Sequence, residues 1–405
     1  MSAAHALLST GAVRERCGRI LQAAIEGRAP AFEVVLARLD DAADVVAAVT
    51  RRRYPTLAVP YHSRWRHFEA GGVDRVAAME AAAGEIDPFA RARARIDLAV
   101  VSVLLDAGAG PAWRFDDRAT GTVLGRSEGL GVASLRAFER GLFSSDPQRP
   151  MQADAEGLAR IDATALGAAF HVDADNPLVG LDGRVALLRR LGEALAAQPA
   201  RFGAPGRPGG LFDALRMSDP TRVAAHDILV ALLSGLGGIW PQGARIGGVA
   251  VGDAWRHRFA GGEGETGGWV PFHKLSQWLA YSLLEPLEEA GLTVTGLDAL
   301  TGLPEYRNGG LFLDTGVLAL KRPEEAGRPH AVGSELVVEW RALTVALLDR
   351  LAPLVRERLG IRDPAALPLA KVLEGGTWAT GRRLAKGLRP DGTPPLTIES
   401  DGTVF

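Results

Sequence analysis

The chain contains little cysteine and lacks a long hydrophobic segment, and each absence excludes a class of protein. Cys17 is the only cysteine among 405 residues, which excludes an intrachain disulfide framework and a cysteine-based zinc site. The longest apolar run, "IDLAVVSVLLDAGAG" from Ile96, carries Asp97 and is too short to span a bilayer. The N-terminal segment has no long apolar core, so no secretory signal is expected. The sequence therefore predicts a soluble protein in a reducing, cytoplasmic environment.

The chain also has no large excess of positive or negative charge. The formal net charge of −2 argues against a general nucleic-acid binder or a protein that binds anionic membrane surfaces. With 47% apolar residues, the chain can bury a substantial core. We expect a single large domain over residues 1–405, with a possible N-terminal helical subdomain over 1–150 and a catalytic core over 151–405.

Apolar residues recur mostly at intervals of three and four, which is typical of amphipathic helices, and strand-like stretches are few and short. We therefore expect a mainly α fold with small β elements. Helices are expected over residues 11–50 (two or three, including "AFEVVLARLDDAADVVAAVTRRR"), 181–199, 222–236, 275–291 and 335–360. Pro353 is expected to kink or split the last of these. Short strands are expected near 245–251, 316–320 and 396–400.

Several motifs of known chemistry are absent from the chain. There is no G-x-x-x-x-G-K-[ST] loop, and no G-x-G-x-x-G follows a convincing strand, so ATPase and dinucleotide functions are not indicated. A G-x-S-x-G elbow is missing and Cys17 lies in an ordinary helical pattern, which argues against a serine or cysteine nucleophile. His62 and His67 are five residues apart with Arg64 and Arg66 between them, a poor metal-ligand pattern. No metal and no cofactor are expected.

Three polar clusters could carry chemistry, and the first is "VPYHSRWRHFEAGG". Its residues Arg64, Arg66 and His67 offer hydrogen-bond donors suited to a phosphate group, and Trp65 could stack on a flat ligand. A solvated basic turn with Trp65 in the core explains the same residues equally well.

The second cluster is "GWVPFHKLSQWL". Pro271 fixes the chain just before a helix, which places His273 and Lys274 in the first turn and Gln277 one turn later. The helix dipole disfavours cations at this end, and an anionic ligand bound to the free N–H groups would reverse that penalty. The structural alternative is a lysine that lies along Trp278.

The third cluster is "LTGLPEYRNGGLFLDTGVL", in which glycines and prolines crowd around Glu305, Tyr306, Arg307 and Asn308. A carboxylate on a braced loop, followed by a phenol and a guanidinium, suits a general base or an electrostatic stabiliser. The structural alternative is a Glu305–Arg307 pair that ties the loop together. We take Glu305, Tyr306 and Arg307 as candidate catalytic residues.

With these clusters in view, the chain resembles the uracil-catabolism protein family of fungi and bacteria, whose members accompany a uracil phosphoribosyltransferase and a GTP-cyclohydrolase-like protein. The resemblance runs nearly end to end. It rests on "VPYHSRWRHF", "NPLVGLDGR", "VPFHKLSQWLAYSLLEPLEEAG", "LTGLPEYRNGGLFLDTGVL", "LEGGTWATGR" and the terminal "SDGTVF". It implies a pathway without naming a reaction.

A more distant resemblance suggests the reaction. The queuosine-salvage nucleotide N-glycosidases, helical relatives of helix-hairpin-helix DNA glycosylases, have a similar order of motifs over about the last two-thirds of the chain. The matching positions here are Lys274 with Gln277, then Glu305-Tyr306-Arg307, then Glu339 with Arg341. This chain has Glu305 where those enzymes have aspartate, and Asn308-Gly309-Gly310 where they continue Val-Pro-Gln. The resemblance implies a glycosylase-like helical architecture and a different leaving group.

Together the two resemblances imply a metal-independent hydrolase in uracil catabolism that splits ribosylurea 5-phosphate into urea and ribose 5-phosphate. Glu305 would stabilise the positive charge that develops on the sugar. His273 and Lys274, or the arginines of the first cluster, would hold the 5′-phosphate. Asn308 and Gln277 would read the leaving group.

The sequence also gives candidates for the pocket walls, two alternative functions and the expected partners. Trp113 or Trp255 would line the pocket, although both also suit a core position. A non-catalytic nucleotide-binding partner of the uracil ring-opening enzyme and a hydrolase of intact uridine monophosphate remain alternatives. The expected partners are a small phosphorylated ribosyl substrate and other uracil-catabolism enzymes, with neither nucleic acid nor membrane.

Overall fold

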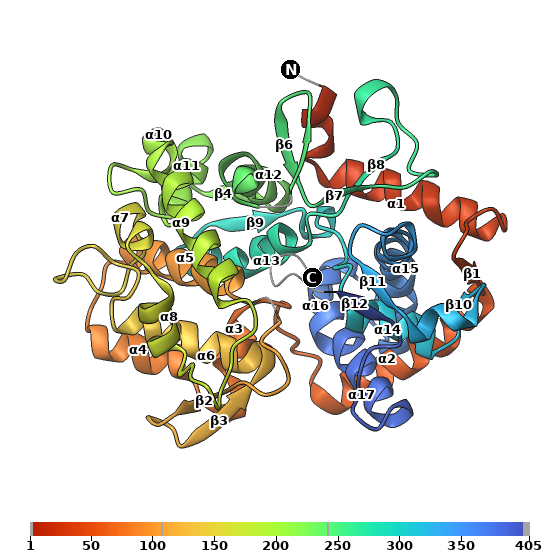
Figure 1. Cartoon of the computed structure of the whole chain (residues 1–405), viewed down its shortest axis with the longest axis horizontal. Coiled ribbons are helices and arrows are strands. Elements are labelled where there is room, and N and C mark those ends of the chain that lie inside the picture. Colours follow the sequence, from red (N-terminus) through yellow and green to blue (C-terminus); the bar gives the residue numbers. More distant parts are fainter. Residues whose placement is uncertain (1–2, 107, 241–242, 400–405) are drawn as a thin grey trace. The chain divides into compact units, whose positions relative to one another are not determined.

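A computed structural model describes residues 3–106, 108–240 and 243–399 of the chain (Figure 1). Helices hold most of these residues, and every strand is three or four residues long. The expected mainly α fold with small β elements is confirmed. The terminal "SDGTVF" string lies outside the described residues. No helix among the described residues has the length and apolarity that crossing a membrane requires.

The chain divides into two units, each assembled from separate segments. Among the described residues, unit 1 contains the chain up to His62, then Ala244–Gln277, and then Gly296 to Glu399. Unit 2 contains Ser63–Gly243 and Trp278–Thr295. The subdomain expected over residues 1–150 stays a prediction, and these units follow different boundaries.

Unit 1 is built around the long helix α15 (Glu335–Leu359), which contacts α1, α2 and α14. In Figure 1 the red helix α1 lies beside α15, although more than 300 residues separate their starts. The remaining helices of unit 1 are α1 (Thr10–Ile25), α2 (Leu39–Arg53), α14 (Tyr306–Asp314), α16 (Leu369–Val372), the π-helix η9 (Leu373–Thr377) and α17 (Trp378–Leu388). Helix α13 (Lys274–Glu289) begins in unit 1 and continues into unit 2.

Helix α15 has strong local signals at both ends. The Ser334 side chain accepts a hydrogen bond from the backbone N–H of Val337, as an N-cap does. At the other end Gly360 adopts a left-handed conformation with φ of 75°, which glycine accepts at little cost. The helix continues through Pro353, so of the expected kink or split at this residue the split does not occur.

The strands of unit 1 form two-stranded pairs. Three pairs are antiparallel and the fourth, β11 with β12, is parallel. They are β1 (Phe32–Val34) with β10 (Leu318–Leu320), β5 (Ala244–Ile246) with β6 (Val249–Gly252), β7 (Ala254–Arg256) with β8 (Trp269–Pro271), and β11 (Pro329–Ala331) with β12 (Thr397–Glu399). The strands expected near 316–320 and 396–400 are thus present, whereas the stretch 245–251, expected as one strand, is the antiparallel pair of β5 and β6.

Two expected helices begin with strands instead. Residues 32–34 form β1, and the helix of this stretch starts only at Leu39. Likewise β4 (Arg222–Ala224) precedes α12 (Ala225–Leu236). Both strands pair with distant segments, β10 and β9 respectively, and such pairing leaves no trace in local periodicity.

Unit 2 is a helical assembly with two small strand pairs. Its helices are α3 (Trp65–Phe68), α4 (Arg75–Ala83), α5 (Pro88–Leu104), α6 (Arg126–Glu139), α7 (Ala155–Ala159), α8 (Ala163–Ala169), α9 (Leu181–Ala196), α10 (Pro199–Phe202), α11 (Gly210–Ser218) and α12. Its strand pairs are the hairpin of β2 (Arg114–Asp117) with β3 (Thr122–Gly125), and the parallel pair of β4 with β9 (Thr293–Thr295).

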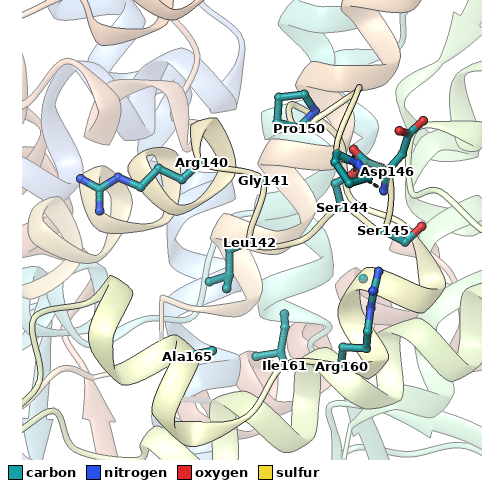
Figure 2. Close-up of a pocket in the computed structure, with 12 residues that line it drawn as sticks. Arg140, Gly141, Leu142, Ser144, Ser145, Asp146, Pro150, Arg160, Ile161 and Ala165 are labelled. Carbon is teal, nitrogen blue, oxygen red and sulfur yellow. Dashed lines mark hydrogen bonds between the residues drawn. The ribbon is translucent and has the colours of Figure 1, made fainter.

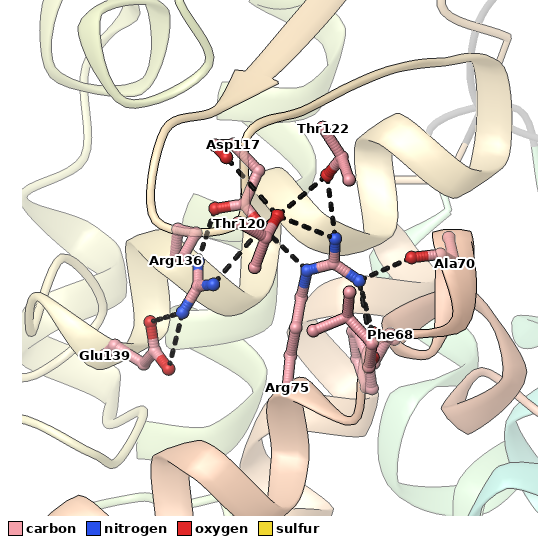
Figure 3. Close-up of polar contacts among 9 residues, drawn as sticks. Phe68, Ala70, Arg75, Asp117, Thr120, Thr122, Arg136 and Glu139 are labelled. Atoms are coloured by element: carbon pink, nitrogen blue, oxygen red, sulfur yellow. Dashed lines mark hydrogen bonds and ion pairs between the residues drawn. The ribbon is translucent and has the colours of Figure 1, made fainter.

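A buried ion network ties this hairpin to the neighbouring helices of unit 2 (Figure 3). Asp117 accepts hydrogen bonds from Arg75 at 2.7 Å and from Arg136 at 2.9 Å. Arg75 also reaches the hydroxyls of Thr120 and Thr122 at 3.2 and 2.9 Å. Because Arg75 is fully buried, these contacts replace the water that its charge has lost.

The glycine-rich stretch that was expected to be an irregular loop is largely helical. The irregular backbone ends at Glu305, and residues 306–314 form α14. A Cβ atom on Gly309 would lie 2.7 Å from Cε2 of Trp340, so this glycine permits close packing of α14 against α15. The Trp340 indole N–H donates to the carbonyl of Gly309 at 3.1 Å. Tertiary packing therefore explains the glycine that suggested a loop.

Candidate functional site

Glu305 is the N-cap of α14. Its backbone is extended, with φ of −110° and ψ of 161°. One carboxylate oxygen accepts the backbone N–H of Arg307 at 2.8 Å, and the other accepts that of Asn308 at 2.5 Å. The carboxylate is therefore held against the positive end of a helix by the backbone itself. With 9% of its surface exposed, Glu305 is a fixed and largely desolvated carboxylate.

Arg307 lies between two aromatic rings. Its guanidinium carbon is 5.0 Å from the ring centroid of Tyr306 and 4.8 Å from that of Trp378, the first residue of α17. Such stacking restrains the guanidinium while leaving hydrogen-bond donors at its edge. All three candidate catalytic residues thus come together at the start of α14.

Two buried amide side chains near this cluster keep a polar atom without a hydrogen-bond partner among the described residues. Asn308 donates through Nδ2 to the carbonyl of Leu303 at 3.2 Å, while its Oδ1 has no such partner. Gln277 accepts from the backbone N–H of Thr301 at 3.4 Å, while its Nε2 has none. Both side chains are fully buried. A buried acceptor and a buried donor of this kind suit a ligand that carries amide groups.

The N-terminal end of α13 meets the carboxylate of Asp253. Its Oδ2 accepts the backbone N–H of Lys274 at 3.0 Å, and Arg341 binds both oxygens at 2.9 and 2.7 Å. Burial raises the pKa of Asp253, but the charge and hydrogen bonds of Arg341 outweigh it and bring the pKa to about 2. An anion of the protein itself therefore lies where the sequence predicted an anionic ligand.

His273 directly precedes this helix in a left-handed conformation, with φ of 51°. Its Nε2 lies 2.9 Å from the carbonyl of Leu7, and burial lowers its pKa. The phosphate-binding role of His273 and Lys274 stays a prediction.

Glu339, one of the two residues matched on α15, is fully buried and bound by the protein. Its carboxylate accepts the backbone N–H groups of Ala31 and Phe32, the latter at 2.8 Å, and lies 3.3 Å from Nε2 of His257. Glu339 therefore holds the start of β1 against α15. Arg341, two residues later on the same helix, holds the carboxylate of Asp253.

The two tryptophans expected to line a pocket lie in different units. Trp255 in unit 1 is half-buried and donates through Nε1 to Asp253 at 2.7 Å. Trp113 in unit 2 is fully buried and donates to the carbonyl of Phe170 at 2.9 Å. Each indole N–H already has a protein acceptor, and the lining role of both stays a prediction.

The basic cluster of unit 2 has carboxylate and aromatic partners within that unit. Arg64 is fully buried, donates from Nη1 to Asp106 at 2.5 Å, and has its pKa lowered by burial. Arg66 pairs with Glu285 at 2.8 Å. The ring of His67 packs edge-on against that of Trp278 at 5.4 Å. These contacts account for the cluster structurally, and its phosphate-binding role stays a prediction.

A buried cluster in unit 1, formed by Glu374 with His62, Arg53 and Tyr54, was not expected from the sequence and is called the Glu374 cluster below. Glu374 lies on the π-helix η9 and is 6% exposed. Its Oε2 is 2.9 Å from Nδ1 of His62, and its Oε1 accepts from Arg53 at 2.8 Å and from Tyr54 at 3.0 Å. Burial raises the pKa of Glu374, but His62 and Arg53 lower it to about 2. A single turn of π-helix often marks a functional position.

The Glu374 cluster adjoins the candidate catalytic residues through Trp378. The ring of Trp378 lies 6.3 Å from that of His62 and carries the guanidinium of Arg307 above it. In the sequence, His62 stands out only as one of two histidines five residues apart, and the other, His67, belongs to unit 2. No group of three or more His, Cys, Asp or Glu side chains suited to a metal ion occurs in the described parts of the chain.

Cavities lined by described residues occur in both units, and they differ in size. A cavity of about 10 Å³ beside Tyr306 and Arg307, between α14 and α17, has room for about one water molecule. Unit 2 contains pockets of about 490 and 470 Å³. Figure 2 shows the first of these, with Leu142 and Ile161 on one side and the loop of residues 144–146 on the other. Within the described residues, neither large pocket is lined by a residue that the sequence singled out.

The chain belongs to the family described as "Protein of unknown function (DUF1688)", whose model matches residues 6–405. It is 40% identical over 411 residues to Protein urg3 of Schizosaccharomyces pombe, an alignment that covers 98% of each chain. It is 38% identical over 413 residues to Uracil catabolism protein 4 of Lachancea kluyveri, which covers 94% of this chain and 93% of that one. The matches extend over both units.

Proposed function

We propose that the protein acts in uracil catabolism as a hydrolase of the N-glycosidic bond of ribosylurea 5-phosphate, releasing urea and ribose 5-phosphate. The pathway assignment is supported by the similarity to Uracil catabolism protein 4 over nearly the whole chain. The reaction is supported by one observation above all. Glu305 is a carboxylate fixed by two backbone N–H groups at a helix start.

A fixed carboxylate suits the transition state of this reaction. As the C1′–N bond breaks, positive charge develops on the sugar ring, as it does in glycoside hydrolysis. A carboxylate that is already held in place stabilises this charge without the cost of reorientation. Glu305 then takes a proton from the water that attacks C1′.

The neighbouring side chains suit the rest of the substrate. Urea presents N–H donors and one carbonyl acceptor, which complement Oδ1 of Asn308 and Nε2 of Gln277. Lys274 on α13 is the candidate contact for the 5′-phosphate, which would supply binding energy remote from the reacting bond. A helical architecture like that of the helix-hairpin-helix glycosylases is part of this proposal.

Mass spectrometry of products tests the proposal directly. The purified full chain is incubated with ribosylurea 5-phosphate, and separately with uridine monophosphate, with and without EDTA. We expect urea and ribose 5-phosphate from the first substrate, at a rate that EDTA does not change. Uracil release from the second substrate would instead identify a hydrolase of the intact nucleotide.

Glu305→Gln is the first variant to compare with the wild-type protein. We expect it to bind substrate with little change and to lose at least about 100-fold in turnover, because a neutral amide cannot stabilise the sugar cation. Glu335→Gln is a matched control, since Glu335 also lies in the first turn of a unit 1 helix but pairs with Arg258. A wild-type rate for Glu305→Gln would contradict the proposal.

The same geometry leaves one other function open. Both oxygens of Glu305 already cap a helix, so Glu305 could be purely structural and the protein a nucleotide-binding partner of the ring-opening enzyme. That function predicts binding of uridine monophosphate in calorimetry without release of any product, together with a stable complex with that enzyme.

A further inference from the structure

Hydrolysis of ribosylurea 5-phosphate needs a proton donor as well as a carboxylate. The urea anion is a very poor leaving group, so the departing nitrogen must receive a proton while the C1′–N bond breaks. Both oxygens of Glu305 accept hydrogen bonds from the backbone, which suits it to stabilise a cation or to accept a proton. The donor must therefore be a different side chain.

His62 has the chemistry for this role. Histidine is the side chain whose ordinary pKa allows it to gain and lose a proton near neutral pH. The ring is 6% exposed, and its Nδ1 lies 2.9 Å from Oε2 of Glu374. This contact fixes the orientation of the ring with Nδ1–H toward the carboxylate and leaves Nε2 for a substrate.

The position of His62 joins it to the candidate catalytic residues by direct contacts within unit 1. Its ring is 6.3 Å from the ring of Trp378, tilted by 45°. Trp378 is in turn 4.8 Å from the guanidinium of Arg307, whose backbone N–H binds Glu305 at 2.8 Å. A chain of contacts through the stacked Arg307–Trp378 pair thus connects the histidine to the carboxylate.

We propose that His62 is a second catalytic residue, which donates the proton to the leaving nitrogen, and that Glu374 is the positioning residue that orients it. This inference rests on the proposed N-glycosidic hydrolysis. The leaving group is one whose departure requires protonation, such as a urea or another amide nitrogen.

The proposed step is balanced in atoms and charge. The C1′–N electron pair leaves with the nitrogen, which takes a proton from Nε2 of His62. Water adds to C1′ and gives a proton to Glu305. Transfer of that proton through solvent back to His62 restores both residues, and the net reaction consumes one water molecule.

The charged groups around His62 are compatible with this role. Glu374 faces it directly, and Arg53 and Tyr54 bind the other oxygen of that carboxylate. On the Trp378 side two cations lie over the indole ring, Arg307 at 4.8 Å and Arg382 at 5.4 Å from its centroid. Removal of Glu374 would therefore free the ring to rotate and leave Arg53 without its carboxylate partner.

Two substrates with different leaving groups test the inference. Ribosylurea 5-phosphate requires a proton at the leaving nitrogen, whereas 4-nitrophenyl ribosyl 5-phosphate does not, since nitrophenolate is stable as an anion. We expect His62→Gln to lose about 100- to 10,000-fold in kcat on the urea substrate and to stay near wild type on the nitrophenyl substrate. Glu305→Gln should lose activity on both.

A matched control separates chemistry from folding. His330 is also a buried histidine of unit 1, and its Nε2 lies 2.8 Å from the carbonyl of Glu325. His330→Gln should keep the wild-type ratio of rates on the two substrates. Equal losses on both substrates for a folded His62→Gln, or no loss on either, would overturn the inference.

The wild-type protein gives a second measurement that does not depend on the stability of a variant. The pH profile of kcat for the urea substrate should contain a limb from the proton donor that the profile for the nitrophenyl substrate lacks. Identical profiles would overturn the role of His62. Failure of the wild-type protein to cleave either substrate would overturn the proposed hydrolysis itself.

Discussion

Asp117 illustrates how a single carboxylate supports buried charges in unit 2. Burial raises its pKa, but hydrogen bonds from Arg136, Arg75 and Thr120 outweigh that effect and bring the pKa to about 2 (Figure 3). Only 2% of Asp117 and none of Arg75 is exposed. A buried arginine depends on its partner, because removing one member of such a pair leaves an uncompensated charge.

We predict that Asp117→Asn lowers the free energy of unfolding by about 3 kcal/mol at neutral pH. The pKa of Asp117 is lower in the folded than in the unfolded chain, so its contribution is complete above about pH 4 and disappears as the pH falls toward 2. Chemical denaturation at several pH values between 7 and 2 measures this. The difference between wild type and variant should shrink across that window.

Asp116→Asn is the matched control for this prediction. Asp116 is the preceding residue of β2, points to the exposed face of the strand, and pairs with Arg118 at 3.5 Å. Its replacement should change the stability by less than about 0.5 kcal/mol. If the loss in free energy of unfolding for Asp117→Asn were as small as that for Asp116→Asn, the ion pairs of Asp117 would contribute little to stability.

Helix α14, which carries the candidate catalytic residues, packs against α17 with almost no space between the two backbones. A Cβ atom on Gly381 would lie 2.1 Å from the carbonyl oxygen of Arg307. This close approach allows Trp378, one turn earlier on α17, to reach the guanidinium of Arg307. The spacing of these helices therefore sets the geometry of the stacked pair.

Gly381→Ala should push α17 away from α14 and destabilise the protein by about 1–3 kcal/mol. Gly387→Ala, on the same helix, has no neighbour within 4 Å of its new Cβ and should stabilise it by about 0.5–1 kcal/mol. Thermal unfolding compares the two variants. If Gly381→Ala were as stable as Gly387→Ala, close packing of these helices would be refuted.

Each unit of the molecule is assembled from segments that are far apart along the chain. In unit 1 the N-terminal helices α1 and α2 pack against α15, which starts at Glu335. The strand β1 pairs with β10, nearly 300 residues later. The hydrophobic faces of the first two helices are therefore covered only when the C-terminal part of the chain is present.

We predict that residues 1–150 expressed alone do not form a folded subdomain. The buried faces of α1 and α2, including Cys17 and Val46, would be exposed to water without α15. Circular dichroism and hydrogen exchange of the fragment, compared with the full chain, measure this. A cooperative unfolding transition of the isolated fragment would contradict the prediction and support a subdomain at these boundaries.

Local signals in the sequence were enough to locate most helices. The helix expected over 335–360 is observed at Glu335–Leu359, and the helix expected over 275–291 at Lys274–Glu289. Serine caps, terminal glycines and 3.6-residue periodicity all act within a few residues, so they can be read directly from the sequence. Glu305, Tyr306 and Arg307 are likewise neighbours in the sequence and form one candidate cluster.

Long-range contacts could not be read in the same way. Glu374 pairs with His62 across 312 residues, and Arg341 pairs with Asp253 across 88. Glu374 and Asp253 do not stand out in their own stretches of sequence, because the role of each depends on a neighbour that only folding supplies. For the same reason, Gly309, which suggested a loop, proved to serve close packing of α14 against α15.

The sequence by itself determined the mainly helical character of this protein, the absence of disulfides, and the grouping of Glu305 with its neighbours, because each follows from composition or from residues a few positions apart. Only the tertiary structure decided that Glu305 caps a helix, that Asp253 occupies the start of α13, and that His62 and Glu374 meet beside Trp378. These features depend on contacts between distant segments, which form when apolar faces are buried together and bring the attached polar groups within hydrogen-bond distance.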